Sequence, residues 1–101
     1  MTPLSSALTR TRQVLLITYD LRTPGRDYKP FYEVLKQQGA WWHYIPSSWL
    51  VATTKSVQDV YTALGQHLSQ QDFILVVPVR KPAFGYLPKG AWDWINANVP
   101  L

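Results

Sequence analysis

The chain has 101 residues, which is the usual length of one domain and too short for two independent hydrophobic cores. Apolar residues make up 47% and charged residues 16%, a balance that is typical of a globular protein and excludes an intrinsically disordered one. There is no cysteine, so disulfides, thiolate zinc sites and cysteine nucleophiles are excluded, and a reducing, cytoplasmic location is expected.

Hydropathy and charge limit the classes of partner that the chain is expected to bind. No apolar run approaches the roughly 20 residues of a membrane helix, so no membrane partner is expected. Ten lysines and arginines against six aspartates and glutamates give a net charge of +4. Such a basic protein attracts polyanions, which makes DNA or RNA a reasonable partner class. The alternative is that this modest charge only maintains solubility.

The first part of the chain predicts a tail, a strand and a helix. Residues 1–11 are polar and predict a flexible tail, which leaves residues 12–101 as the single domain. Residues 12–21 predict a strand with two largely apolar faces. After a Pro-Gly turn, residues 27–38 predict a helix that starts at Asp27 as N-cap and stops at the glycine that follows.

The middle of the chain predicts a hairpin and a second helix. Residues 40–45 and 49–54 are aromatic or β-branched runs around a short polar break, which is typical of a hairpin. Ser56 predicts the start of the second helix through a capping-box-like pair with Asp59. An apolar stripe at helical spacing then follows, so this helix is expected to pack one face on the sheet.

The last part of the chain completes the fold prediction. Residues 73–79 predict a strand with two apolar faces, and residues 87–97 predict a short closing helix. The order strand, helix, strand, strand, helix, strand predicts an α+β domain of the ferredoxin-like βαββαβ type, with a four-stranded antiparallel sheet and a C-terminal segment. Two helices cover only one face of such a sheet, yet its first and last strands are apolar on both faces. We therefore expect a homodimer through the open sheet face.

Four segments of the sequence resemble a known family. They are TYDL at residues 18–21, PGRDY at 24–28, GAWWHYIPSSW at 39–49 and DFILVV at 72–77. Together they resemble the SinR-like family of small proteins, which is distinct from the helix-turn-helix regulator of the same name. That family is in turn similar to the ferredoxin-like CRISPR-associated protein of the spacer-adaptation complex and to the VapD ribonuclease superfamily. The resemblance covers about residues 14–79.

This resemblance implies a homodimer packed through the open sheet faces, with an aspartate at the end of the first strand near the twofold axis. Asp20 matches that aspartate by position. Some members use it to bind a divalent metal ion for phosphodiester cleavage, so Asp20 is the candidate catalytic residue and the candidate ligand for Mg²⁺ or Mn²⁺. The alternative is that Asp20 only ends the strand and caps the turn that follows.

Three basic residues follow this aspartate in the sequence. Arg22, Arg26 and Lys29 are candidate nucleic-acid-binding residues, because lysine and arginine in a loop contact phosphates. The alternative is a solvated charged loop with no binding role.

The predicted hairpin carries a cluster of aromatic residues. Alternation along a strand sends Trp41 and Trp42 to opposite faces of the sheet, so we expect one in the core and the other at the dimer interface. Stacking of bases on this cluster, which also contains Tyr44 and Trp49, is the alternative. His43 shares a face with Trp41, and we expect it to be packed and hydrogen-bonded rather than a general acid or base.

Two classes of function stay open on these observations. The favoured hypothesis is a small dimeric module that binds nucleic acid or a protein partner, resembling the CRISPR-associated adaptation scaffold and non-catalytic. It is favoured because each chain offers one candidate carboxylate and no obvious base. The alternative is a metal-dependent endonuclease or toxin-like ribonuclease that uses Asp20 at the dimer axis.

Overall fold

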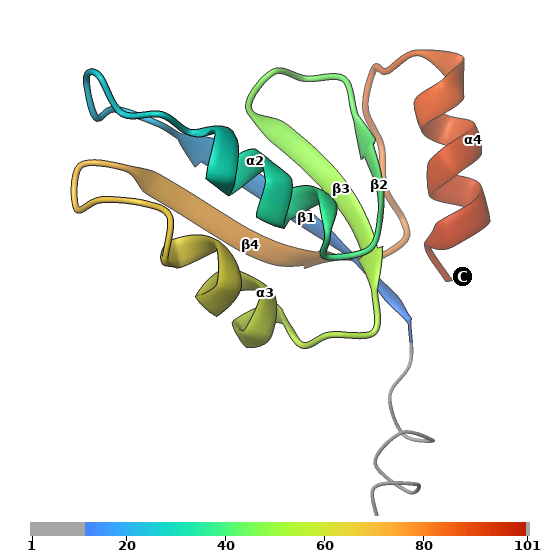
Figure 1. Ribbon diagram of the computed structural model, residues 1–101. Helices are drawn as coiled ribbons and strands as arrows, with labels where there is room; N and C mark the ends of the chain where they lie inside the picture. The colour runs from blue at the N-terminus through green and yellow to red at the C-terminus, as the bar shows by residue number, and fades with distance from the viewer. Residues whose placement is uncertain (1–11, 101) are drawn as a thin grey trace, which may run out of the picture.

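The computed structural model describes residues 12–100, so the predicted tail at residues 1–11 and Leu101 lie outside the described residues. Four strands and three helices follow one another along this part of the chain (Figure 1). They are β1 (Gln13–Asp20), α2 (Lys29–Lys36), β2 (Ala40–His43), β3 (Ser48–Thr53), α3 (Val57–Gly65), β4 (Phe73–Val79) and α4 (Lys89–Asn98). The predicted order of strands and helices is therefore confirmed.

The four strands form one antiparallel sheet with β1 near its centre. β1 pairs with β3 on one side and with β4 on the other, and β2 extends the sheet beyond β3, which gives the order β2-β3-β1-β4. Because β1 has a neighbour on both edges, it carries three fully buried side chains, Val14, Leu15 and Ile17. The order is compatible with a ferredoxin-like fold.

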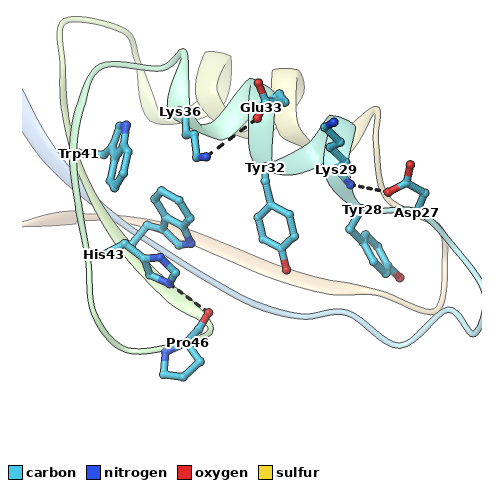
Figure 2. Close-up of a pocket in the computed structure, with 10 residues that line it drawn as sticks. Asp27, Tyr28, Lys29, Tyr32, Glu33, Lys36, Trp41, His43 and Pro46 are labelled. Atoms are coloured by element: carbon cyan, nitrogen blue, oxygen red, sulfur yellow. Dashed lines mark hydrogen bonds and ion pairs between the residues drawn. The ribbon is translucent and has the colours of Figure 1, made fainter.

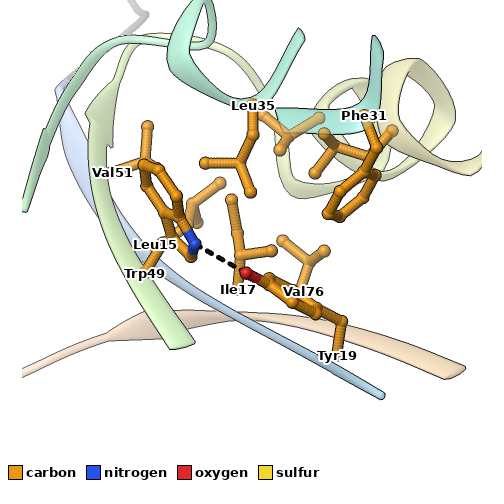
Figure 3. Packing of buried hydrophobic residues seen from close by; sticks show 10 residues of the cluster. Leu15, Ile17, Tyr19, Phe31, Leu35, Trp49, Val51 and Val76 are labelled. Carbon is orange, nitrogen blue, oxygen red and sulfur yellow. Dashed lines mark hydrogen bonds between the residues drawn. The ribbon is translucent and has the colours of Figure 1, made fainter. Parts of the chain in front are cut away.

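Helices α2 and α3 lie side by side over one face of this sheet (Figure 1). Leu15, Ile17 and Tyr19 alternate along β1 and point toward these helices (Figure 3). Phe31 and Leu35 of α2 meet them, and α3 adds a valine and a leucine to the same cluster. Removing a side chain of this kind from water stabilises the folded state by about 1.5–3 kcal/mol, so this cluster is the main core of the domain.

Helices α2 and α3 begin in different ways. The Ser56 hydroxyl accepts a hydrogen bond of 3.0 Å from the backbone N–H three residues on, so the predicted cap of α3 is confirmed. The prediction that α2 starts with Asp27 as its N-cap is wrong, because α2 begins at Lys29 and Tyr28 holds the cap position. The Tyr28 side chain provides no capping bond, and its hydroxyl donates instead to Asp72 in the loop before β4.

The second face of the sheet is covered at one end by α4. Ile95 of this helix and Val99, which follows its last residue, form a buried cluster with Val14 of β1 and Ala52 of β3. The predicted closing helix is therefore present and supplies part of the cover that the apolar strands require. No helix within residues 12–100 is long and apolar enough to cross a membrane.

The other end of the second face is not covered by any described element. Phe73 and Leu75 of β4 are 57% and 56% exposed, although both lie on a strand. The register places Thr18 opposite Leu75, and Leu16 opposite Val77, on the same face. We call this strip of β1 and β4 the open face; it comprises Leu16, Thr18, Phe73, Leu75 and Val77.

Candidate functional site

Asp20 lies at the edge of the open face, at the last position of β1 and opposite Phe73 of β4. Its Oδ2 lies 2.9 Å from Nε of Arg22, so the carboxylate forms an ion pair with the loop that follows it. The two side chains are 59% and 60% exposed, and an ion pair that is so exposed contributes little to stability. The position of Asp20 at the strand end is confirmed, whereas its role stays a prediction.

The donor atoms around Asp20 do not fit a metal site within one chain. Mg²⁺ prefers about six oxygen ligands in octahedral geometry and binds proteins through carboxylates. Within residues 12–100, no three aspartate, glutamate, histidine or cysteine side chains lie close enough together to hold a metal ion. The Asp20 carboxylate is in addition paired with a guanidinium. A site for Mg²⁺ or Mn²⁺ at this place would therefore need the same residue from a second copy of the chain.

The three predicted nucleic-acid-binding residues have different neighbours. Arg22 pairs with Asp20, and its guanidinium carbon lies over the Phe73 ring, 5.5 Å from the ring centroid, at the end of the open face. Arg26 donates from Nη2 to the backbone oxygen of His67 at 2.9 Å. Lys29 lies at the first position of α2, and its backbone N–H donates to Asp27. Thus only Arg22 lies beside Asp20.

Asp72, in the loop before β4, is the residue that holds this region together. Its carboxylate accepts hydrogen bonds from the backbone N–H of Arg22 at 2.7 Å, the hydroxyl of Tyr28 at 2.6 Å, and the backbone N–H of Ser69 at 2.9 Å. Partial burial by itself raises the pKa of Asp72, but these hydrogen bonds outweigh that effect and hold the pKa well below its ordinary value of 3.8. The ionised carboxylate therefore fastens the loop after β1 to the loop before β4.

One signal in the sequence points to part of this arrangement. Ser69 and Asp72 are three residues apart, the spacing at which a serine and an acidic side chain bind each other's backbone, and Ser69 N–H does donate to Asp72. The bonds from Arg22 and Tyr28 span 50 and 44 residues of sequence, and no local pattern predicts them.

The hairpin places its aromatic side chains on two faces, as the alternation predicts. Trp42 stacks on Tyr44, with ring centroids 5.8 Å apart. Trp41 and His43 lie on the side of α2, where both contact Trp49 of β3. Together with α2 they border an open groove of about 640 Å³, which we call the aromatic groove (Figure 2). Its lining also includes Asp27, Tyr28, Lys29, Tyr32, Glu33, Lys36 and Pro46.

The inner wall of the aromatic groove is held by one buried hydrogen bond and by ring stacking. Trp49 is 3% exposed, and its Nε1–H donates to the hydroxyl of Tyr19 at 2.8 Å (Figure 3). His43 stacks on Trp49 with ring centroids 4.0 Å apart, and its Nε2 lies 3.2 Å from the backbone oxygen of Pro46. The expectation that His43 is a packed, hydrogen-bonded residue on the face of Trp41 is confirmed in these contacts, although its side chain stays exposed.

The expectation that Trp41 or Trp42 lies in the core is wrong. Trp41 is 42% exposed and Trp42 is only half-buried. β2 is an edge strand, so its side chains lie beyond the area that α2 and α3 cover. Trp49, one strand closer to the centre of the sheet, occupies the core position instead. Trp41 is therefore available to a ligand.

Comparison of the chain with protein-family models, with curated proteins and with solved structures gives no significant match.

Proposed function

We propose that this chain is a non-catalytic homodimeric module that binds nucleic acid. The observation that carries the proposal is the open face, where Phe73 and Leu75 stay more than half exposed on a strand that otherwise belongs to the core sheet. Contiguous apolar surface of this kind on a small domain marks an interaction site. The α4 helix covers the other end of the same face, so a partner needs to cover only this strip.

A second copy of the chain is the partner that fits this strip best. A twofold interface presents the same patch twice, so the patch must be complementary to itself. The open face meets this requirement because its centre is apolar and its edge carries one carboxylate, Asp20, next to one guanidinium, Arg22. In a twofold pair, each carboxylate can meet the guanidinium of the other copy.

The charge of the chain supports nucleic acid as the ligand of the dimer. One chain carries a net charge of +4, so two chains carry twice that, and a larger positive field attracts a polyanion more strongly. Arg26 and Lys29 extend from the loop and the helix start that follow β1. The Asp72 hydrogen bonds give the loop a defined shape, so these charges are presented at fixed positions.

Oligomeric state tests the dimer. We expect wild type to have a mass near twice 11.6 kDa by light scattering at micromolar concentration. Leu75→Glu should be monomeric, since it places an unpaired charge in the interface. Tyr61→Glu is the matched control, because Tyr61 is 51% exposed but lies on α3, on the opposite side of the sheet, and it should stay dimeric. A monomeric wild type, or a Leu75→Glu variant that dimerises as well as the control, would contradict the proposal.

Nuclease activity tests the non-catalytic part of the proposal. We expect little or no cleavage of DNA or RNA by wild type with Mg²⁺, and no change on addition of EDTA or in Asp20→Asn. This substitution keeps the shape of the side chain and removes the charge that would hold a metal ion. Strong Mg²⁺-dependent cleavage that is lost in Asp20→Asn would contradict the non-catalytic proposal and favour the metal-dependent nuclease.

A further inference from the structure

The aromatic groove differs in character from the open face. It lies between α2 and β2 on the helix side of the sheet, and it combines aromatic rings with lysine side chains at its rim (Figure 2). Its volume of about 640 Å³ falls within the range of small-ligand sites. We propose that this groove binds one nucleotide of a single-stranded nucleic acid, with the base stacked on Trp41 and the phosphates at Lys29 and Lys36. The inference rests on the proposed nucleic-acid binding and assigns it a site.

The aromatic rings of the groove form a rigid stacking platform. Trp49 is fixed by its hydrogen bond to Tyr19, and the Trp41 ring lies with its centroid 5.0 Å from that of Trp49. Trp41 is therefore held from behind while 42% of its surface remains exposed. Because the Trp41 ring is already held in place, stacking of a base on it does not have to order the ring, and the entropy cost of binding is lower.

The lysines lie where a phosphate adjoining that base would be. Lys36 Nζ lies over the Trp41 ring, 5.9 Å from its centroid. A base that stacks on this face must displace the ammonium, and the long lysine side chain then stays within reach of the phosphate that adjoins the base. The carboxylate nearest to Lys36 is that of Glu33 at 3.9 Å, a long contact that leaves the ammonium able to bind an anion. Lys29 lies seven residues earlier, which is two helical turns and about 10 Å along the same side of α2. Two positive charges thus flank the groove along its length.

The carboxylates that line the groove favour binding of the edge of a base and disfavour binding of a phosphate backbone inside the groove. Glu33 lines the groove together with the lysines, and carboxylates accept hydrogen bonds from the exocyclic amino groups of bases. A carboxylate also repels a phosphate chain that runs through the groove itself. In a duplex the base faces are stacked on each other and cannot reach Trp41, so the groove fits a single strand.

The test is fluorescence anisotropy with a labelled single-stranded oligonucleotide of 12 nucleotides and the full chain. Stacking of a base on one aromatic ring is lost in Trp41→Ala, which should weaken binding by about 5- to 140-fold. Tyr61→Ala is the matched control, since it removes an aromatic ring of similar exposure from α3, and its affinity should equal that of wild type. Lys36→Glu, a surface change, should weaken binding and reduce its salt dependence.

The possible outcomes distinguish the assignment of the binding site to the groove from the proposal that the chain binds nucleic acid. If wild type binds the oligonucleotide and both Trp41→Ala and Lys36→Glu bind equally well, the groove assignment is overturned while nucleic-acid binding stands. If wild type binds the duplex but no single strand, the groove assignment is overturned while nucleic-acid binding stands; if it binds neither, both are overturned. A duplex of the same length should compete weakly, and equal competition would overturn the single-strand assignment. Adenosine monophosphate should bind more weakly than the strand, whereas equal affinity would assign the groove to a free nucleotide instead.

Discussion

Tyr19→Phe removes two hydrogen bonds that join the core to the aromatic groove. The hydroxyl of Tyr19 accepts from Trp49 Nε1–H at 2.8 Å and lies 3.3 Å from the backbone oxygen of Pro46. The two rings are 8% and 3% exposed, so water does not replace the lost oxygen at the indole nitrogen. The rest of the Tyr19 ring, including its edge contact with Phe31, is kept in the variant.

The expected loss of stability follows from this burial. Leaving a buried donor without a partner costs about 1–3 kcal/mol. For a domain of this size each kcal/mol lowers Tm by about 4–8 °C, so the Tm of Tyr19→Phe should fall by at least about 4 °C. Thermal unfolding followed by circular dichroism measures this shift. Tyr44→Phe makes the same chemical change at a residue that is 63% exposed and should leave Tm unchanged.

The pH dependence of the Tm difference between wild type and Tyr19→Phe gives a second test. Burial of Tyr19 raises its pKa to about 12 from the ordinary 10.0, although the hydrogen bond from Trp49 acts in the opposite direction. Since the folded state favours the neutral phenol, this contribution to stability is complete below pH 10 and is lost as pH rises through about 12. The Tm difference between wild type and Tyr19→Phe should therefore narrow over that interval. A Tyr19→Phe shift no larger than that of Tyr44→Phe would refute this reasoning.

Two further substitutions test the loops that position the candidate sites. Asp72→Asn should lower Tm at neutral pH, because an amide cannot accept all the bonds that the carboxylate accepts. Since the folded-state pKa of Asp72 lies well below 3.8, the Tm difference from wild type should narrow progressively as pH falls below 3.8 toward that lower pKa. A Tm difference that does not narrow over this acid range would contradict the reasoning. Gly39→Ala should be destabilising by about 1–3 kcal/mol, because a Cβ at Gly39 would overlap the backbone oxygen of Ala52 on the neighbouring strand. Gly90→Ala, where a Cβ meets nothing within 4 Å, is its control, and equal Tm values for the two would count against the observed pairing of β2 with β3.

Local patterns predicted the elements well, because each has its cause within a few residues. The apolar run at residues 73–79 is β4 with the same bounds, and Ser56 caps α3 through a bond to a residue three positions away. The alternation of Trp41 and Trp42 between two faces is likewise a property of one strand. Such features depend on backbone geometry alone and need no knowledge of the rest of the fold.

The parts of the site that depend on distant neighbours could not be predicted in the same way. Asp72 binds residues that precede it by 44 and 50 positions, and only the pairing of β1 with β4 brings them together. The exposure of Trp41 follows from the place of β2 at the edge of the sheet, which strand order decides. The cover that α4 gives to Val14 depends on the path of the chain after β4.

The most direct test of the central claim is native mass spectrometry of the full chain with a single-stranded oligonucleotide. We predict a species of two chains, twice 11.6 kDa, in its absence and the same two chains with bound oligonucleotide in its presence. Leu75→Glu should appear as one chain under the same conditions. A wild-type spectrum that contains only single chains at micromolar concentration, with or without oligonucleotide, would contradict the claim that two copies meet through the open face to bind nucleic acid.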